Sequence, residues 1–347
     1  MKLRQFQTIL AQKKIDLAFF TFNDPSLTYF LQTELTGGYL FVTPQKAFLL
    51  CSPLDAPPRQ KGIQTHPLSV GWEKRYLNST ARRVGINKTI LTVGLLEKIK
   101  KLFPRAVMID LSPDLQQLRQ EKTSSELRLI GQACQLTSAA FQALLAELPG
   151  QVLRTEQDVA LFLEAHIRKN GGSLAFPTIV AMGKNASTPH HCTSLTRLRR
   201  GFLLLDFGAR VRGYCADMTR IIFLGKPTRT EEEYYSLLLQ AQKDAISAVK
   251  DGVLFSELDA SARQRLGKQA VRFTHSLGHG IGIEVHEAPI FSQKSSSVQK
   301  NVPFTIEPGI YFPKKFGLRI EDTVVWDGKK VKILTSAAKE LAIIKKN

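Results

Sequence analysis

The sequence predicts an α+β protein of two domains, on three observations. The chain has 347 residues, enough for two hydrophobic cores at about 150 residues per domain. Residues 1–120 alternate short apolar runs with helical segments, whereas residues 121–347 begin with long capped helices and continue into strand-like runs. The candidate chemical groups lie in the second part. We therefore expect a supporting domain over residues 1–120 and a catalytic domain over residues 121–347.

In the supporting domain, three short apolar runs have the length of buried strands, over residues 16–22, 39–43 and 47–51. Turn residues such as Pro25 and Pro44 separate them from their neighbours. The only histidine of this part is His66. This domain therefore has no catalytic cluster.

In the catalytic domain, a Thr followed three residues later by an acidic residue marks the start of three helices, because such pairs form a capping box. These pairs are Thr123 with Glu126, Thr155 with Asp158, and Thr230 with Glu233, and the helices they begin end near Pro149, Asn170 and Gly252. A fourth helix is expected over residues 256–270. Apolar runs over residues 202–207, 220–224, 304–312 and 318–326 predict strands.

The overall composition is that of a folded protein. It is 43% hydrophobic and 22% charged, which excludes disordered and collagenous chains. No uninterrupted apolar run approaches the roughly 20 residues of a membrane span, and the N-terminus lacks the apolar core of a signal peptide. The four cysteines have no short paired spacing, which excludes a zinc knuckle and a disulfide framework. We expect no membrane association and a cytoplasmic location.

The net charge of +18 raises the question of a nucleic-acid partner. The excess is divided evenly, +9 in residues 1–120 and +9 in residues 121–347. The densest basic clusters, at residues 98–101, 197–200 and 329–332, are short, distant from one another and free of interleaved aromatic residues. A solvated basic surface explains this pattern better, and we expect no nucleic-acid partner.

Two aspartates mark the first part of a candidate site. Asp206 ends the apolar run 202–205, and Asp217 follows eleven residues later, beyond a candidate hairpin turn at residues 211–213. The two carboxylates can face each other across this hairpin. Two buried carboxylates are costly unless a cation pairs with them.

The remaining acidic and imidazole groups follow in three short segments. Residues 274–289 contain three histidines, and glycines flank His279 on both sides, which lets the backbone approach another group closely. Glu307 and Glu321 each lie inside a largely apolar strand candidate. Four buried carboxylates and one neutral imidazole need positive charge, which a pair of divalent ions supplies. Oxygen-rich ligation favours Mn²⁺, Co²⁺, Fe²⁺ or Zn²⁺ over copper.

Together these segments resemble the metallopeptidases of the creatinase/methionine aminopeptidase superfamily, and within it the Xaa-Pro peptidases, aminopeptidase P and prolidase. The similarity is carried by residues 206–208, 214–220, 278–282, 306–309 and 319–322, and by the segment 176–190. It implies a pita-bread fold for residues 121–347, preceded by a smaller α/β domain of the creatinase type.

The resemblance also implies roles for individual residues. The expected ligands of two divalent ions, Mn²⁺ first with Co²⁺ or Zn²⁺ as alternatives, are Asp206, Asp217, His279, Glu307 and Glu321. Asp217 and Glu321 are expected to bridge the two ions. Glu307 would also shuttle a proton, and His190 and His286 would stabilise the oxyanion or bind the scissile carbonyl. Arg319 is expected to orient Glu321 or a neighbouring carboxylate.

The implied activity is hydrolysis of the bond before proline in proline-containing peptides, by an enzyme that we expect to be a homodimer. Some dipeptide-specific prolidases carry an Arg where this chain has Ile290, and its absence favours an Xaa-Pro aminopeptidase acting on longer peptides, with prolidase as the alternative. A metal-free binding protein and a metal-free creatinase-type enzyme are disfavoured by the complete ligand set. The N-terminal domain disfavours a methionine aminopeptidase.

Overall fold

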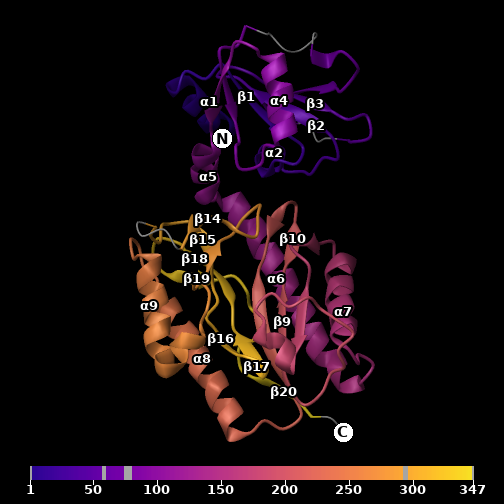
Figure 1. Ribbon diagram of the computed structural model, residues 1–347, viewed down its shortest axis with the longest axis vertical. Helices are drawn as coiled ribbons and strands as arrows, with labels where there is room; N and C mark the ends of the chain where they lie inside the picture. The colour runs from indigo at the N-terminus through magenta and orange to yellow at the C-terminus, as the bar shows by residue number, and fades with distance from the viewer. Residues whose placement is uncertain (1, 57–59, 74–79, 292–295, 346–347) are drawn as a thin grey trace. The chain divides into compact units, whose positions relative to one another are not determined.

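The computed structural model describes residues 2–56, 60–73, 80–291 and 296–345. The chain forms two compact units, Met1–Arg119 and Gln120–Asn347 (Figure 1). Each unit has its own sheets and its own buried core.

The first unit is built on one mixed six-stranded sheet with the order β4-β3-β2-β1-β5-β6. Its elements are α1 (Lys2–Gln12), β1 (Leu17–Thr21), α2 (Pro25–Leu31), β2 (Gly38–Val42), β3 (Ala47–Cys51), β4 (Gln64–Pro67), β5 (Arg83–Ile86), α4 (Val93–Leu102), β6 (Val107–Asp110) and α5 (Ser112–Gln120). The three strands predicted in this part are β1, β2 and β3. Phe19, Phe41 and Trp72 pack together on one face of this sheet.

The second unit contains four α-helices among its described residues, α6 (Ser124–Glu147), α7 (Glu156–Lys169), α8 (Arg229–Ser247) and α9 (Phe255–Leu266), and the 3₁₀ segments η1 (Leu148–Gly150), η2 (Gly183–Ser187) and η3 (Gly267–Arg272). Its strands are β7 (Ser173–Leu174), β8 (Ile179–Met182), β9 (Gly201–Phe207), β10 (Ala209–Val211), β11 (Tyr214–Cys215), β12 (Met218–Leu224), β13 (His279–Gly280), β14 (Glu287–Ile290), β15 (Pro303–Ile306), β16 (Gly309–Phe312), β17 (Phe316–Arg319), β18 (Asp322–Trp326), β19 (Val331–Ile333) and β20 (Ala342–Ile344). The two larger sheets have the orders β20-β12-β9-β8 and β14-β13-β15-β18-β19.

The sheet that contains β9 is covered on both faces, which explains why β9 reads as an unbroken apolar run. Leu203 and Leu205 share a core with residues of α6 and α7, whereas Phe202 and Leu204 share the other core with residues of α8 and α9. In Figure 1 the sheets of the second unit lie between the helix pair α6 and α7 and the pair α8 and α9. Asp206 falls on the same face as Phe202 and Leu204 by strand alternation.

Helix α6 begins with the predicted capping box, since Thr123 Oγ1 accepts from Glu126 N and the Glu126 carboxylate accepts from Thr123 N. The helix and its 3₁₀ continuation are long and apolar enough, by length and composition alone, to cross a membrane. It nevertheless packs against α7, β10 and β11 and buries Ile130, Phe141 and Leu144. Its hydropathy is therefore accounted for by its place in a protein core.

Helix α8 begins two residues earlier than predicted. Its N-cap is Thr228, which forms a capping box with Glu231, whereas the sequence also allows the same spacing for Thr230 with Glu233. The Glu231 carboxylate also pairs with the guanidinium of Arg200. The predicted pair at Thr230 was wrong, and the helix also ends earlier, at Ser247.

Two of the predicted long strands are each broken in the middle. The run 304–312 is β15 and β16 with Glu307 and Pro308 between them, and the run 318–326 is β17 and β18 with Ile320 and Glu321 between them. Pro308 has no N–H for a strand ladder. The expectation that both glutamates lie within strands was wrong, because each lies at a break.

Candidate metal centre

Five side chains from five different parts of the second unit meet at one place. Asp206 comes from β9, Asp217 from the link between β11 and β12, His279 from β13, and the two glutamates from the strand breaks. Their potential ligand atoms form groups within 4.8 Å of one another: Asp206, Asp217 and Glu321; His279, Glu307 and Glu321; and Asp217, His279 and His286. The structure thus brings together all the residues expected as ligands.

A tight hairpin delivers Asp217. Strands β10 and β11 pair across Arg212 and Gly213, whose φ angles are +48° and +84°, as in the two-residue turns that match the strand twist. Strand β12 then runs back along β9 with Asp206 opposite Thr219. The predicted hairpin is confirmed, and it places Asp217 beside Asp206.

The breaks in the strands bring Glu321 to the two aspartates and Glu307 to His279. At its break, Glu321 donates its backbone N–H to Thr219 O (3.2 Å), and Glu307 donates its own to Leu277 O (2.8 Å). These hydrogen bonds tie each glutamate to a neighbouring segment that already belongs to the site.

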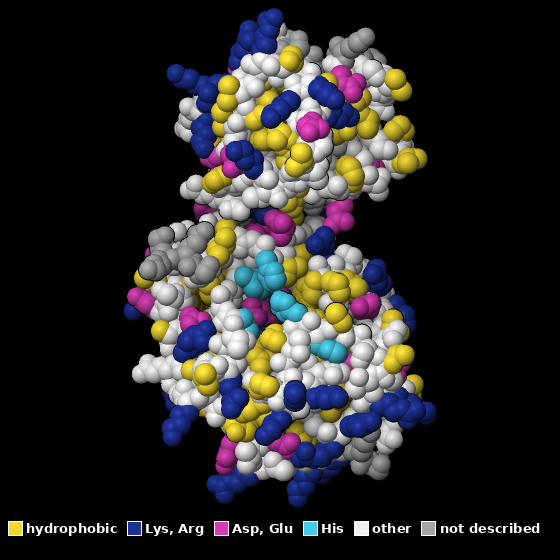
Figure 2. Space-filling view, viewed as in Figure 1, with side chains coloured by type: hydrophobic (Ala, Val, Ile, Leu, Met, Phe, Trp, Pro, Cys, Tyr) yellow, Lys and Arg dark blue, Asp and Glu magenta, His cyan; other side chains and the backbone are white. Residues whose placement is uncertain are grey.

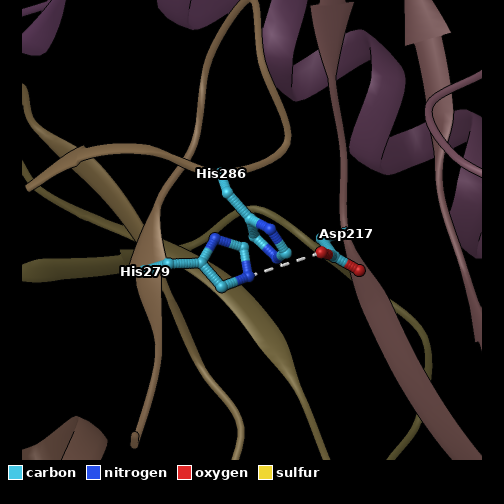
Figure 3. A group of neighbouring side chains, drawn as sticks. All are labelled: Asp217, His279 and His286. Atoms are coloured by element: carbon cyan, nitrogen blue, oxygen red, sulfur yellow. Dashed lines mark ion pairs between the residues drawn. The ribbon is translucent and has the colours of Figure 1, made fainter. Parts of the chain in front are cut away.

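The histidine presents a lone pair to the carboxylates. Burial and the neighbouring His286 lower the pKa of His279 to about 3, so its imidazole is neutral. Its Nδ1 lies 3.2 Å from Gly280 O and must carry the ring hydrogen, because a carbonyl only accepts. Nε2 therefore has a free lone pair, and it lies 3.6 Å from Asp217 Oδ2 and 3.3 Å from Glu307 Oε1. Figure 3 shows the approach to Asp217. None of these three atoms has a hydrogen to donate when both carboxylates are ionised.

Three carboxylate oxygens here are buried without a hydrogen-bond partner among the described residues: Asp206 Oδ1, Asp217 Oδ1 and Glu321 Oε1. Buried charged oxygens normally have partners, so three unpaired ones at one place indicate a binding site for a cation. One imidazole lone pair and four carboxylates, three of them with such unpaired oxygens, are a donor set that fits divalent cations of borderline or hard character.

Electrostatics give the same indication. Burial and the surrounding carboxylates raise the pKa values of Asp217 and Glu321 well above their ordinary range. Burial raises the pKa of Glu307 to about 8, although Arg319 opposes this. Without added positive charge the site would therefore hold protons, and a divalent cation would displace them.

One buried cation is already present. Arg319 donates to Asp206 Oδ2 (2.5 Å), to Thr219 Oγ1 (3.0 Å) and to Tyr311 Oη (2.9 Å). Its Nε lies 3.9 Å from Glu307 Oε2. Arg319 therefore fixes Asp206 directly, one of the alternatives expected from the sequence.

The two histidines expected on the substrate side are both exposed. The His286 ring lies 4.0 Å from the ring of His279, centroid to centroid. Partial burial of its ring and the neighbouring His190 lower the pKa of His286. Figure 2 shows histidine side chains gathered on this surface of the second unit, with acidic side chains in the hollow beside them.

Several contributors were not predicted from the sequence. Thr219 Oγ1 donates to Glu321 Oε2 (2.7 Å), and Thr305 Oγ1 donates to Glu307 Oε1 (3.2 Å). His275 Nδ1 lies 2.8 Å from Ser276 O, so Nε2 accepts from Tyr311 Oη (2.9 Å). His275 belongs to the histidine-rich segment and could have been singled out there. Nothing in the sequence marks the two threonines except their nearness to acidic residues.

Comparison with protein families adds an independent finding. The model of metallopeptidase family M24 matches residues 128–327, and that of the creatinase/prolidase N-terminal domain matches residues 2–120. The chain belongs to metallopeptidase family M24. Its second unit is the pita-bread domain of that family and its first is the creatinase-type N-terminal domain, as the resemblance implied. M24 is a family of metallopeptidases, which implies divalent metals.

Relatives of known name and structure cover nearly the whole chain. A Pyrococcus horikoshii protein named Xaa-Pro dipeptidase is 32% identical, with 98% of each chain covered. The structure of the prolidase from the same organism superposes with a TM-score of 0.88 at 30% identity, covering 98% of this chain and 99% of that one. The structure of an X-Pro aminopeptidase from Thermotoga maritima also superposes with a TM-score of 0.88, at 29% identity, covering 95% of this chain and 98% of that one.

These M24 relatives bear on the specificity expected from the sequence. Xaa-Pro peptidase names are found among both the sequence relatives and the solved structures. The names of the sequence relatives favour the dipeptidase alternative over the aminopeptidase that Ile290 suggested.

Proposed function

We propose that this M24 peptidase is a divalent-metal-dependent Xaa-Pro dipeptidase, a prolidase, which cleaves the bond before proline in dipeptides. The observation that carries the proposal is the group of three buried carboxylate oxygens without partners among the described residues, on Asp206, Asp217 and Glu321. The neutral imidazole of His279 shares a ligand group with Asp217 and another with Glu321. The dipeptidase names of relatives that cover 98% of the chain supply the substrate class.

Asp206, Asp217, His279, Glu307 and Glu321 would hold two divalent cations, with Mn²⁺ as the first candidate and Co²⁺ or Zn²⁺ as alternatives. Asp217 and Glu321 share one ligand group with Asp206, and each shares another with His279. Each carboxylate has two oxygens, whereas His279 offers one free nitrogen, which supports a bridging position for Asp217 and Glu321. When bound, such a pair polarises a carbonyl and makes hydroxide available from water near neutral pH.

The protein's own groups then handle the protons and orient the substrate. Glu307 would accept the proton of the attacking water and deliver it to the leaving nitrogen of proline. The hydrogen bond from Thr305 Oγ1 would keep the Glu307 carboxylate in place during this transfer. His190 and His286, exposed beside the site, would donate hydrogen bonds to the carbonyl oxygen as it gains negative charge. Arg319 keeps the Asp206 carboxylate oriented.

A bond to proline requires such a dedicated site, because its nitrogen has no N–H. A peptidase that reads the N–H of the scissile bond cannot recognise this substrate. We infer that shape and carbonyl contacts, rather than that N–H, select the substrate.

Xaa-Pro aminopeptidase activity is the second candidate, and Ile290 favours it. This residue lies opposite His279 in the pairing of β13 with β14 and is 42% exposed. It therefore stands beside the candidate centre without offering a cation to a substrate carboxylate. A free C-terminal carboxylate next to proline is what distinguishes a dipeptide from a longer peptide.

The deciding experiment compares Ala-Pro with Ala-Pro-Ala as substrates of the purified full chain, over Mn²⁺, Co²⁺ and Zn²⁺. The dipeptidase proposal expects a higher kcat/KM for Ala-Pro. A higher value for Ala-Pro-Ala would replace it with the aminopeptidase. Ile290→Arg supplies a matched variant, since a new cation at this position should lower KM for Ala-Pro and leave Ala-Pro-Ala unimproved.

No turnover of either peptide with any of the three metals would contradict the peptidase proposal itself. Salt-sensitive binding to DNA by the same inactive preparation would instead support a binding protein, because release of counterions makes such binding weaken with salt.

A further inference from the structure

A buried carboxylate outside the metal centre organises the segment that carries His190. Glu156, at the start of α7, is fully buried. Its Oε1 accepts from Met182 N (2.7 Å) and Asn185 Nδ2 (2.8 Å). Its Oε2 accepts from Ser194 N (3.1 Å) and Ser194 Oγ (2.7 Å), and lies 3.0 Å from His191 Nε2.

All five of these partners act as donors to one carboxylate. Burial works against ionisation of Glu156, but the hydrogen bonds from Met182, Ser194 and Asn185 outweigh it and lower its pKa. An ionised carboxylate only accepts, so His191 Nε2 carries a hydrogen. The side chain of His191 is thereby fixed, and with it the backbone of the residue next to His190.

The same segment is also held from the side of the metal centre. Arg319, which fixes Asp206, points a second N–H at Pro189 O (3.5 Å). The carbonyl of Ala186 lies so close to Gly317 in β17 that a Cβ there would come within 1.8 Å of it, which only glycine tolerates. His190 therefore lies between an anchor to the centre and an anchor to Glu156.

We propose that Glu156 is a positioning residue, which sets the place of the His190 imidazole through five hydrogen bonds to residues 182–194. The inference deepens the proposed function and rests on it, since it assumes that His190 contacts the substrate. Glu156 itself touches neither substrate nor metal. Its effect on catalysis passes through His190 alone.

Glu156→Gln is the sharp variant because it keeps the size of the side chain. An amide has one acceptor oxygen and one NH₂ group, so at least two of the five donors would face another donor. A displacement of about 1 Å can cost a factor of about 100 in rate. Glu164→Gln, on the same helix and with the same change of charge, is the matched control.

The kinetic test is a double-mutant cycle on Ala-Pro hydrolysis by the Mn²⁺-loaded full chain. Glu156→Gln should lower kcat by about 10- to 100-fold, with KM and bound metal little changed. In the His190→Ala background, the same substitution should cost almost nothing more, because the two residues act as one unit. The proposal would be overturned if the losses in kcat from Glu156→Gln and from His190→Ala multiplied in the double variant. It would also be overturned if Glu156→Gln were as active as the control Glu164→Gln.

A second measurement does not depend on peptidase activity, so it separates the failure of this inference from the failure of the proposed function. In Glu156→Gln, the backbone amides of Met182 and Ser194 should exchange hydrogen faster, and the NMR signal of His190 Cε1–H should shift. That signal is assigned by its loss in His190→Ala. Unchanged exchange and an unmoved His190 signal would refute the positioning role, whether or not the wild type cleaves Ala-Pro.

Discussion

Glu321 and Asp322 are neighbours in the chain and both are buried, yet their surroundings are opposite. Glu321 lies among other carboxylates, with one oxygen unpaired. Asp322 lies on the other side of the backbone in a cluster where both its oxygens are paired with cations. Two adjacent acidic residues thus belong to two buried clusters of different kinds.

The Asp322 cluster is complete in itself. Asp322 Oδ1 accepts from Arg220 and Thr335, each at 2.7 Å, and Oδ2 accepts from Lys339 (2.7 Å) and Gln242 (2.8 Å). Although burial opposes ionisation, Arg220 and Lys339 lower the pKa of Asp322 to about 2. Such a saturated cluster has no capacity left for a ligand, and its role is structural.

The Glu321 cluster is incomplete in itself. Burial and the neighbouring carboxylates raise the pKa of Glu321, and they outweigh the lowering by Arg319 and by the hydrogen bond from Thr219. Burial alone therefore does not mark a functional carboxylate. What separates the two clusters is whether the protein itself supplies the compensating positive charge.

The largest effect expected from this contrast concerns Asp217→Asn. Removing one carboxylate of the incomplete cluster should lower kcat/KM by about a thousandfold or more, because the remaining groups no longer hold both cations. Metal per chain, measured by mass spectrometry of the bound ions, should fall in parallel. The metal-free variant should be at least as stable as the metal-free wild type, since one buried repulsion is gone. A large loss of stability would instead assign Asp217 to a structural cluster.

Asp322→Asn is the counterpart in the complete cluster. It leaves the buried Arg220 and the half-buried Lys339 without their shared counter-charge, and breaking one partner of a buried ion pair costs about 3–5 kcal/mol. We expect the free energy of unfolding in urea to fall by that amount with and without metal. A variant that keeps its stability but loses metal would show that the two clusters are not separate.

Much of the fold could be predicted because its signals are local. The capping boxes at Thr123 and Thr155 are read within four residues, and β1 to β3 are short apolar runs. The start of α8 could not be predicted, because two Thr–Glu pairs with the same spacing occur two residues apart and only the first forms the capping box.

The sequence predicted the residues of the site but not the hydrogen bonds that hold them. Asp206, His279 and Glu307 stand out by type and spacing, and their roles as ligands stay a prediction. The contacts of Thr219 with Glu321 and Arg319 join residues about a hundred positions apart. No periodicity or local motif signals such a contact. For the same reason Glu156 appeared in the sequence only as the first residue of a helix.

The two clusters should also give stability opposite dependences on pH. Asp322 has its pKa lowered from 3.8 to about 2, so its contribution of about 2 kcal/mol is present above pH 4 and is lost as the pH falls toward 2. Glu307 has its pKa raised from 4.5 to about 8. Its contribution is therefore present below pH 4.5 and is lost as the pH rises through 8.

Metal-free protein should accordingly be less stable at pH 8 than at pH 7, as measured by urea unfolding in the presence of a chelator. This window lies above 6.5, the ordinary pKa of histidine, so His279, whose lowered pKa makes stability rise with pH below 6.5, does not mask the loss. Saturating Mn²⁺ should abolish this loss, because the cation replaces the proton. Glu307→Gln should reduce the loss in the metal-free protein. A metal-free protein that gains stability between pH 7 and pH 8 would contradict the assignment of unpaired charge to this cluster.

The smallest expected effect compares two buried threonines that each donate one hydrogen bond of 2.7 Å, Thr219 to Glu321 and Thr335 to Asp322. Valine replaces either without a change of volume. Thr219→Val should weaken metal binding about 10- to 100-fold, as loss of a group that orients a ligand does. Thr335→Val should leave metal affinity unchanged and lower the free energy of unfolding by about 1–3 kcal/mol. Isothermal titration with Mn²⁺ and urea unfolding of both variants measure the two quantities. If both substitutions weakened metal binding, or if both only lowered the free energy of unfolding, the clusters of Glu321 and Asp322 would not be separate.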